Sequence, residues 1–247
     1  MPLEQRIGTP YAEGLDLPPP FRAVALREAG DAFAHAAKIA PRDGAGTLVH
    51  VGRYDLAEFA VVLEPEQPLC GARRAFYAGM TALVDALAAH APPEKPIAID
   101  WPDAIRVDGG LIGGGRLGEP ASASEDARPD WLVFGCSVRT FAMGVAEPGL
   151  NPSSAALEDE GFELGLGKLT ESFARHFLTA IDLWQHDGFA GIAHSYLARL
   201  QPMPGVTYAL ADNGDLLLRR GSKTERRDLK SALAAPSWLD PATGGPR

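Results

Sequence analysis

The chain has 247 residues, a formal net charge of −9 and an apolar fraction of 46%. A chain of this length can bury a hydrophobic core without disulfides or metals, and its negative charge argues against broad binding to nucleic acids or anionic membranes, which requires a basic surface. No apolar run reaches the length of a membrane span, and the first residues lack the basic and apolar regions of a secretory signal. We therefore expect a cytoplasmic globular protein.

The first half of the chain alternates predicted strands and helices. Residues 1–20 are rich in proline and are expected to be extended. A short strand at 24–26 precedes an alanine-rich helix that ends near residue 40, and Asp31 is placed to cap this helix. Strands at 47–51 and 59–63 flank a short loop at 52–55. Apolar residues at helical spacing then predict an amphipathic helix between residues 72 and 89.

The segment 99–119, with the sequence IDWPDAIRVDGGLIGGGRLGE, is the most informative part of the chain. It predicts a strand that ends at Trp101-Pro102, a tight turn at 108–110 and a second strand through Gly113-Gly114-Gly115. The glycine run either lets the backbone approach a ligand or forms a bulge in the sheet. A polar loop at 120–130 leads to an apolar run at 131–138, which predicts a strand buried on both faces.

The second half opens with a long acidic loop at 147–168, in which a short helical turn is expected at 155–157. Apolar spacing predicts a helix from residue 169 that ends at Gly188, and another from Phe189. Asn213-Gly214 lies between strands at 206–210 and 216–219 and predicts a type I′ hairpin turn. We therefore divide the chain into an extended segment (1–20), a main domain (21–201), a small β unit (202–233) and a Pro/Gly-rich tail (234–247).

The order of these elements and the segment 99–119 resemble the biotin/lipoate protein ligase (biotin/lipoate A/B protein ligase) family. Its members carry Lys-Trp-Pro-Asn-Asp, then a hairpin, then a lysine shortly before Gly-Gly or Ala-Gly. The resemblance covers most of the chain. It implies an α+β fold of the class II synthetase and biotin protein ligase type, in which a mixed, largely antiparallel sheet packs with helices beside a small C-terminal β unit.

The resemblance also implies a ligand site. Family ligases make an acyl-adenylate from ATP and biotin or lipoate, and then transfer the acyl group to a lysine of a carrier protein. Biotin, lipoate or ATP is thus the implied ligand, and a biotinyl or lipoyl carrier domain is the implied partner. The positions that match the family's ligand-binding segments are Gly52, Arg53, Trp101, Asp103, Gly113, Gly114, Gly115, Gly135 and Arg139.

Several positions depart from the family pattern. Residues 100–104 read Asp-Trp-Pro-Asp-Ala, so the family's first lysine becomes Asp100 and its final aspartate becomes Ala104. The second lysine falls at Leu111, and the asparagine of the family's Gly-Ile-Asn motif falls at Arg139. The resemblance implies that each of these positions contacts ATP or the adenylate. Loss of one donor that stabilises transition-state charge costs on the order of 10²–10³ in rate.

Four arginines and one cysteine are candidates to compensate. Arg53, Arg106, Arg116 and Arg139 lie in segments that converge on the family's ligand pocket, although exposed arginines are commonly solvated or paired with carboxylates. Cys136 matches in kind the nucleophile of some transferases in the superfamily and would need a base such as His50 or His176. A cysteine in an apolar strand is more often a small core residue.

Other candidates have structural alternatives as well. Trp101 either lines the pocket or belongs to the core, and Asp103 either binds a ribose or cation or caps a turn. The histidines and the two cysteines, Cys70 and Cys136, show no metal-ligand spacing, so no metal site is expected.

Three functions remain open. The first is a ligase-like protein, a pseudoenzyme that binds a small acyl acid (biotin, lipoate or octanoate) or its adenylate with weak or lost ligase activity. The second is an active ligase or acyltransferase that modifies a carrier-protein lysine with non-standard catalytic residues. The third is a structural or interaction protein on a ligase fold. The retained Trp-Pro and glycine segment beside the missing lysines favours the first.

Overall fold

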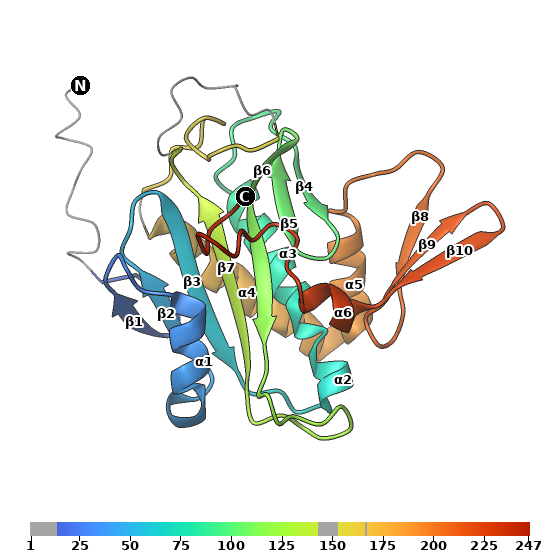
Figure 1. Ribbon diagram of the computed structural model, residues 1–247, viewed down its shortest axis with the longest axis horizontal. Helices are drawn as coiled ribbons and strands as arrows, with labels where there is room; N and C mark the ends of the chain where they lie inside the picture. The colour runs from blue at the N-terminus through green and yellow to red at the C-terminus, as the bar shows by residue number, and fades with distance from the viewer. Residues whose placement is uncertain (1–13, 143–152, 166) are drawn as a thin grey trace.

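A mixed sheet of seven strands forms the centre of the protein (Figure 1). The computed structural model describes residues 14–142, 153–165 and 167–247. Within these ranges one neighbouring pair of strands in this sheet is parallel, the first two, and the other pairs are antiparallel, as predicted. In order across the sheet the strands are β1 (Arg22–Leu26), β2 (Thr47–Val51), β3 (Leu56–Leu63), β7 (Leu132–Arg139), β6 (Gly110–Gly118), β5 (Ala104–Val107) and β4 (Ile97–Asp100).

Helices cover both faces of this sheet (Figure 1). One face carries α1 (Ala32–Asp43). The opposite face carries α3 (Ala75–Ala88), α4 (Lys168–Asp187) and α5 (Phe189–Leu197), and the short α2 (Leu69–Ala72) leads into α3. None of the described helices is both long and apolar enough to cross a membrane.

Alternation along β3 divides the hydrophobic core between these two faces. Phe59 and Val61 belong to the core beneath α3 and α4, whereas Ala60 and Val62 belong to the core beneath α1. This follows from the two-residue period of a strand, which points successive side chains to opposite faces. The sheet is therefore buried on both faces at its centre.

Local sequence signals set the ends of the helices. The Asp31 carboxylate accepts a hydrogen bond from the Ala34 N–H at 2.8 Å, which confirms the predicted cap of α1. Gly188 ends α4 with a φ of +67° and donates its N–H to the Trp184 carbonyl. Phe173 and Phe177 of α4 are buried, as their helical spacing predicted.

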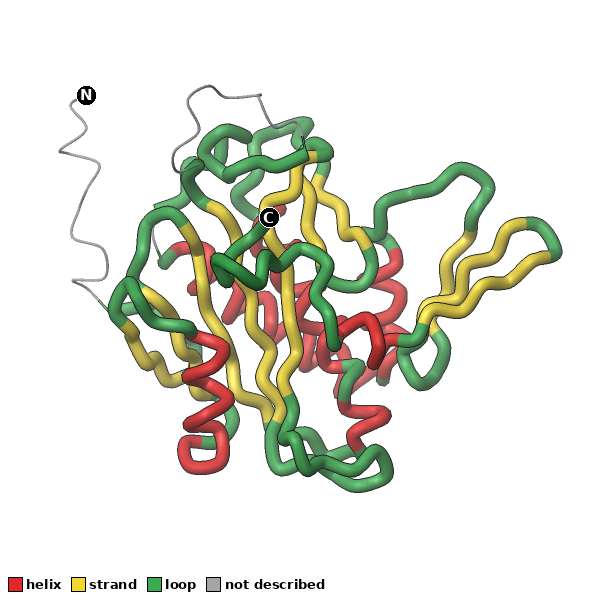
Figure 2. The backbone as a smooth tube through the Cα atoms, viewed as in Figure 1, coloured by secondary structure: helices red, strands yellow, loops and turns green. Residues whose placement is uncertain are grey.

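A second, antiparallel sheet of three strands stands to one side of the main sheet (Figure 2). Its strands are β8 (Thr207–Leu210), β9 (Leu216–Arg220) and β10 (Lys223–Arg227), followed by the short helix α6 (Leu229–Leu233). The first two strands confirm the predicted hairpin. The third was missed because its five residues, KTERR, are all exposed and so lack an alternating apolar pattern.

The turn expected at Asn213-Gly214 is of a different type. Of these two residues only Gly214 has a left-handed φ, at +90°, and its N–H donates to the Ala211 carbonyl at 2.8 Å. A type I′ turn needs two consecutive positive φ angles, so that expectation is wrong. Such a pair occurs between β5 and β6, where Asp108 and Gly109 have φ angles of 47° and 85°.

The acidic loop at 147–168 is described in part, since residues 143–152 and 166 lie outside the described ranges. The helical turn expected at 155–157 lies slightly later, since Glu160 donates its N–H to the Ala156 carbonyl at 3.2 Å. Ala155 donates its N–H to the Leu111 carbonyl at 3.0 Å, and Leu111 donates to the Ser153 carbonyl at 2.9 Å, so these residues pair with the edge of β6 instead. The chain turns at 157–161.

Packing of α3 on the sheet requires a glycine at position 79. A Cβ atom added to Gly79 would lie 2.3 Å from the Phe134 ring. Gly79→Ala gains helix propensity but overpacks the core, so we expect a net loss of about 1–2 kcal/mol in urea unfolding. Gly165→Ala is the matched control, because its added Cβ would lie 3.7 Å from the Lys168 side chain. A Gly79→Ala protein as stable as wild type would contradict this packing.

Candidate functional site

The glycine run of β6 is in close contact with the rest of the chain. Gly113 has a φ of +150°, and its added Cβ would lie 2.0 Å from the Ser137 carbonyl oxygen. The added Cβ of Gly115 would lie 2.5 Å from the sulfur of Met80 on α3. The register between β5 and β6 shifts between Ile105 and Arg106, where Ile112 is the extra residue of a bulge beside Gly113. The structure thus has the bulge that was one of the two predicted alternatives, and the groups that approach the run in it belong to the protein itself.

On the face of the sheet opposite α3, the glycine run holds the indole of Trp238. A Cβ added to Gly114 would lie 2.0 Å from the Asp103 carbonyl oxygen and 2.4 Å from the indole, and the Trp238 Nε1–H donates to the Gly115 carbonyl at 2.9 Å. Trp238 is fully buried and packs with Ala104 and Leu111. We call the surface formed by Ala104, Leu111, Gly114 and Gly115 the glycine cradle. Trp238 lies in the segment expected to be a tail, and sequence reasoning missed its role.

Asp103 fixes the chain next to this indole. Its carboxylate accepts hydrogen bonds from the Ser237 N–H at 2.9 Å and from the Ser237 hydroxyl at 2.6 Å. Asp103 is 1% exposed, and burial raises the pKa of its carboxyl from 3.8 to about 6 despite these two donors. The Asp103 carboxylate therefore forms its hydrogen bonds within the protein.

The Trp-Pro turn is tied to helices on the opposite face of the sheet. The Trp101 Nε1–H donates to the Tyr77 hydroxyl at 3.1 Å, and Tyr77 in turn donates to the Gly214 carbonyl at 2.5 Å. The Tyr196 hydroxyl donates to the Pro102 carbonyl at 2.7 Å. These bonds connect the turn to α3, α5 and the small sheet.

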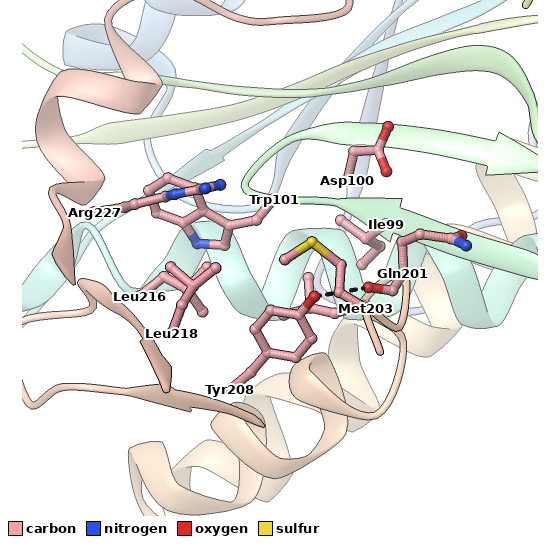
Figure 3. A pocket seen from close by; sticks show the side chains of 10 residues that line it. Ile99, Asp100, Trp101, Gln201, Met203, Tyr208, Leu216, Leu218 and Arg227 are labelled. Atoms are coloured by element: carbon pink, nitrogen blue, oxygen red, sulfur yellow. Dashed lines mark hydrogen bonds between the residues drawn. The ribbon is translucent and has the colours of Figure 1, made fainter. Parts of the chain in front are cut away.

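Trp101 also lines an open cleft between the end of β4 and the small sheet (Figure 3). The cleft has a volume of about 210 Å³ and mostly apolar walls. Its lining residues are Ile99, Asp100, Trp101, Leu200, Gln201, Met203, Tyr208, Leu216, Leu218 and Arg227. Sequence analysis did not anticipate it, because its walls come from segments about 100 residues apart in the chain.

Each arginine proposed as a replacement cation already has a partner in this chain. Arg116 also stacks its guanidinium 4.1 Å from the centroid of the Phe33 ring. The hydrogen bond from Arg53 lowers the pKa of the Asp55 carboxyl. The pairs are Arg53 with Asp55 at 2.5 Å, Arg106 with Asp100 at 2.6 Å, Arg116 with Asp31 at 3.1 Å, and Arg139 with the Pro246 carbonyl at 2.7 Å.

Strand pairing brings part of the predicted site together at one end of the sheet. Arg139 is the last residue of β7 and pairs with the first residue of β3. The loop that holds Gly52 and Arg53 directly precedes β3. Gly113 pairs with the residue before Arg139. Gly135 lies nearer the start of β7, away from Arg139, and its added Cβ would lie 2.6 Å from the Phe33 side chain.

Cys136 occupies the core. It pairs with Gly115 in the sheet and is 2% exposed, and burial raises the pKa of its thiol. A higher pKa leaves less thiolate at neutral pH, so this environment does not activate a nucleophile. Within the described ranges, no group of three or more His, Cys, Asp or Glu residues is placed to hold a metal ion.

Comparison with known proteins connects this geometry with ligases. The chain matches the biotin/lipoate A/B protein ligase family over residues 17–198. It is 26% identical over 179 residues to a biotin–[acetyl-CoA-carboxylase] ligase of Paracoccus denitrificans, an alignment that covers 64% of this chain and 72% of the relative.

Two solved structures share the fold. A biotin protein ligase-like protein of unknown function from a Silicibacter species has a TM-score of 0.77 and 28% identity, covering 89% of this chain and 99% of its own. The apo biotin protein ligase of Aquifex aeolicus has a TM-score of 0.65 and 11% identity, covering 84% and 95%. These neighbours confirm the predicted fold class.

The raised pKa of Asp103 makes stability depend on pH. Between about pH 4 and 6 the folded protein holds a proton that the unfolded chain releases, so stability falls as the pH rises through this window, by on the order of 2–3 kcal/mol. Asp103→Asn removes this contribution, and urea unfolding at pH 4 and pH 7 measures it. Asp126→Asn, at an exposed position, should behave like wild type. Equal pH dependence of wild type and Asp103→Asn would contradict the assignment.

Proposed function

The chain belongs to the biotin/lipoate A/B protein ligase family, and from this premise we propose that it binds a small acyl acid (biotin, lipoate or octanoate) or its adenylate, with weak or lost ligase activity. A biotinyl or lipoyl carrier domain is the protein partner that fits this function. The proposal separates two properties, a retained place for a ligand and a depleted set of catalytic charges, which different observations support.

The retained frame supports ligand binding. Trp101-Pro102 directly follows β4 and the glycine run lies on β6, the positions at which the family pattern has its ligand-binding segment. The glycine cradle offers bare backbone on a buried face, which lets a flat group lie directly on the strand. The ligase of Paracoccus denitrificans, by its name, acts on biotin, which favours biotin among the three acids.

One observation is the main support for a weak or lost ligase activity. The two positions at which the family has a lysine and an aspartate hold Leu111 and Ala104, and both pack against the Trp238 indole. A site built to offset phosphate charge needs fixed cations and donors, whereas this one is an apolar contact. Where the family has charged groups, this chain thus has two apolar side chains that pack against Trp238.

The arginine pairings support the same conclusion. Arg106 and Arg116 are equally near to Leu111 in sequence, and Arg106 pairs with Asp100, the residue that stands in place of the family's first lysine. A guanidinium that leaves a carboxylate to stabilise a phosphate gains only the difference between two ion pairs. Neither Arg53 nor Arg116 is better placed, since each pairs with an aspartate.

The occupied cradle favours a second candidate, a structural or interaction protein on a ligase fold. In this alternative Trp238 is a permanent part of the core and no small acid binds. The two candidates differ in ligand binding, whereas both predict little adenylation.

Adenylation is measured by ATP–pyrophosphate exchange with biotin, lipoate or octanoate. We expect exchange at least about 100-fold below that of the Aquifex aeolicus ligase assayed in parallel, because several transition-state donors are replaced. Exchange at the rate of that ligase would refute the loss of activity and favour an enzyme with non-standard catalytic residues.

Binding is measured by thermal shift with the three acids and with their non-hydrolysable acyl-adenylates. A ligand at about 100 times its dissociation constant adds about 2.7 kcal/mol, which corresponds to several degrees for a protein of this size. We expect such a shift with at least one acid or adenylate. If no compound stabilises the protein, the structural or interaction protein is the better description.

A further inference from the structure

The segment 237–247 runs across the face of β6 and β7 on the side of the sheet that carries α1 (Figure 1). We call these residues the strap. Trp238, Gly245 and Pro246 are its buried residues, and the others from 239 onward are exposed or half-buried. Trp238 is therefore the large side chain through which the strap contacts the glycine cradle.

Hydrogen bonds fix both ends of the strap. At its start, Ser237 donates twice to the Asp103 carboxylate. At its other end, Arg139 donates to the Pro246 carbonyl at 2.7 Å and to the Arg247 carbonyl at 3.1 Å. The strap closes on itself as well, because the Arg247 N–H donates to the Trp238 carbonyl at 2.9 Å.

The contact between ring and cradle has the form of a ligand site. A flat fused ring lies against bare glycine backbone, with apolar side chains of Ala104 and Leu111 around it. The ring N–H donates a hydrogen bond to the Gly115 carbonyl. Any replacement ligand must fill the same flat space and supply a similar donor.

We propose that the strap is a removable occupant of the glycine cradle, in which Trp238 stands in for an external ring with an N–H donor, and that such a ring enters only when the strap leaves. This inference rests on the proposed function for the identity of the external ligand. Of the three acids, biotin alone has a fused ring system with N–H donors, whereas lipoate and octanoate have no N–H group. The cradle thus selects for biotin, and the strap lowers the apparent affinity for biotin in proportion to the fraction of molecules in which the cradle is open.

Local attachment gives the strap a way to leave. Its contacts are the Trp238 ring, Leu239 beside it, the buried Gly245 and Pro246 and a small set of hydrogen bonds, whereas α3 and α4 share the large central core. Segments with few buried contacts open at lower free energy than the core. The strap can then open while the sheet and its helices stay folded.

The first test uses indole and needs no assumption about the acyl ligand. In the full chain, Trp238→Gly leaves a ring-shaped space, and indole should raise the melting temperature of this variant and restore hydrogen-exchange protection at residues 111–116. Trp131→Gly, a half-buried tryptophan outside the cradle, is the control and should not respond in these residues. A folded Trp238→Gly protein that does not respond to indole would overturn the inference.

The second test uses biotin. Trp238→Gly should bind biotin at least about tenfold more tightly than wild type, and indole should compete with it. Equal biotin affinity of wild type and variant would overturn the strap as a competitor. Binding of indole without binding of biotin would support the cradle as a ring site and refute the proposed acyl ligand, so the two failures are distinguishable.

A milder variant covers the case in which Trp238→Gly does not fold. Ser237→Ala removes the hydroxyl bond to Asp103 without touching the ring. Hydrogen exchange across 237–247 should accelerate about tenfold or more, while exchange in α4 stays unchanged. Equal acceleration in the strap and in α4 would show that the strap opens only with the whole protein, against the inference.

Discussion

The packing of the Trp238 indole on Gly114, with its N–H on the Gly115 carbonyl, is the contact on which the surrounding features depend. It requires glycine in the strand, because any side chain at position 114 would occupy the space of the ring. It also requires apolar neighbours, which Ala104 and Leu111 supply. Features that appear separately in the sequence, a glycine run, two missing charged residues and an isolated tryptophan, thus form one structure.

Electrostatics at the same end of the sheet follows a consistent pattern. Ligase chemistry needs cations that are free to meet phosphate, and the four candidate arginines of this chain are paired with its own acceptors. Asp100 and Asp55 neutralise two of them, and Arg139 binds carbonyls of the strap. With a net charge of −9, the chain has more carboxylates than cations, which makes internal pairing of arginines easy. Family membership is therefore compatible with a site that has changed its chemistry.

Much of the fold could be predicted from the sequence, because its signals are local. The cap at Asp31, the glycine that ends α4 and the apolar spacing of Phe173 and Phe177 depend on residues within a few positions of one another. The strand β10 escaped prediction because charged residues cover both of its faces. The turn at Asn213 differed because a longer loop there needs only one positive φ angle.

The candidate site was less predictable, since its main contact joins residues 123 positions apart. The sequence identified Gly114, Gly115 and Asp103 as special positions, but nothing near them indicates that Trp238 binds there. A tryptophan inside a Pro/Gly-rich segment was the available signal, because a side chain of that size is rarely left in solvent.

The central claim is that one surface serves both Trp238 and an external ring. A crystal structure of the full chain grown with a non-hydrolysable biotinyl-adenylate tests it most directly. The account predicts the biotin ring against Gly114, with Trp238 displaced and the strap released from Asp103. A structure in which the ligand binds elsewhere while the indole stays on Gly114 would contradict it.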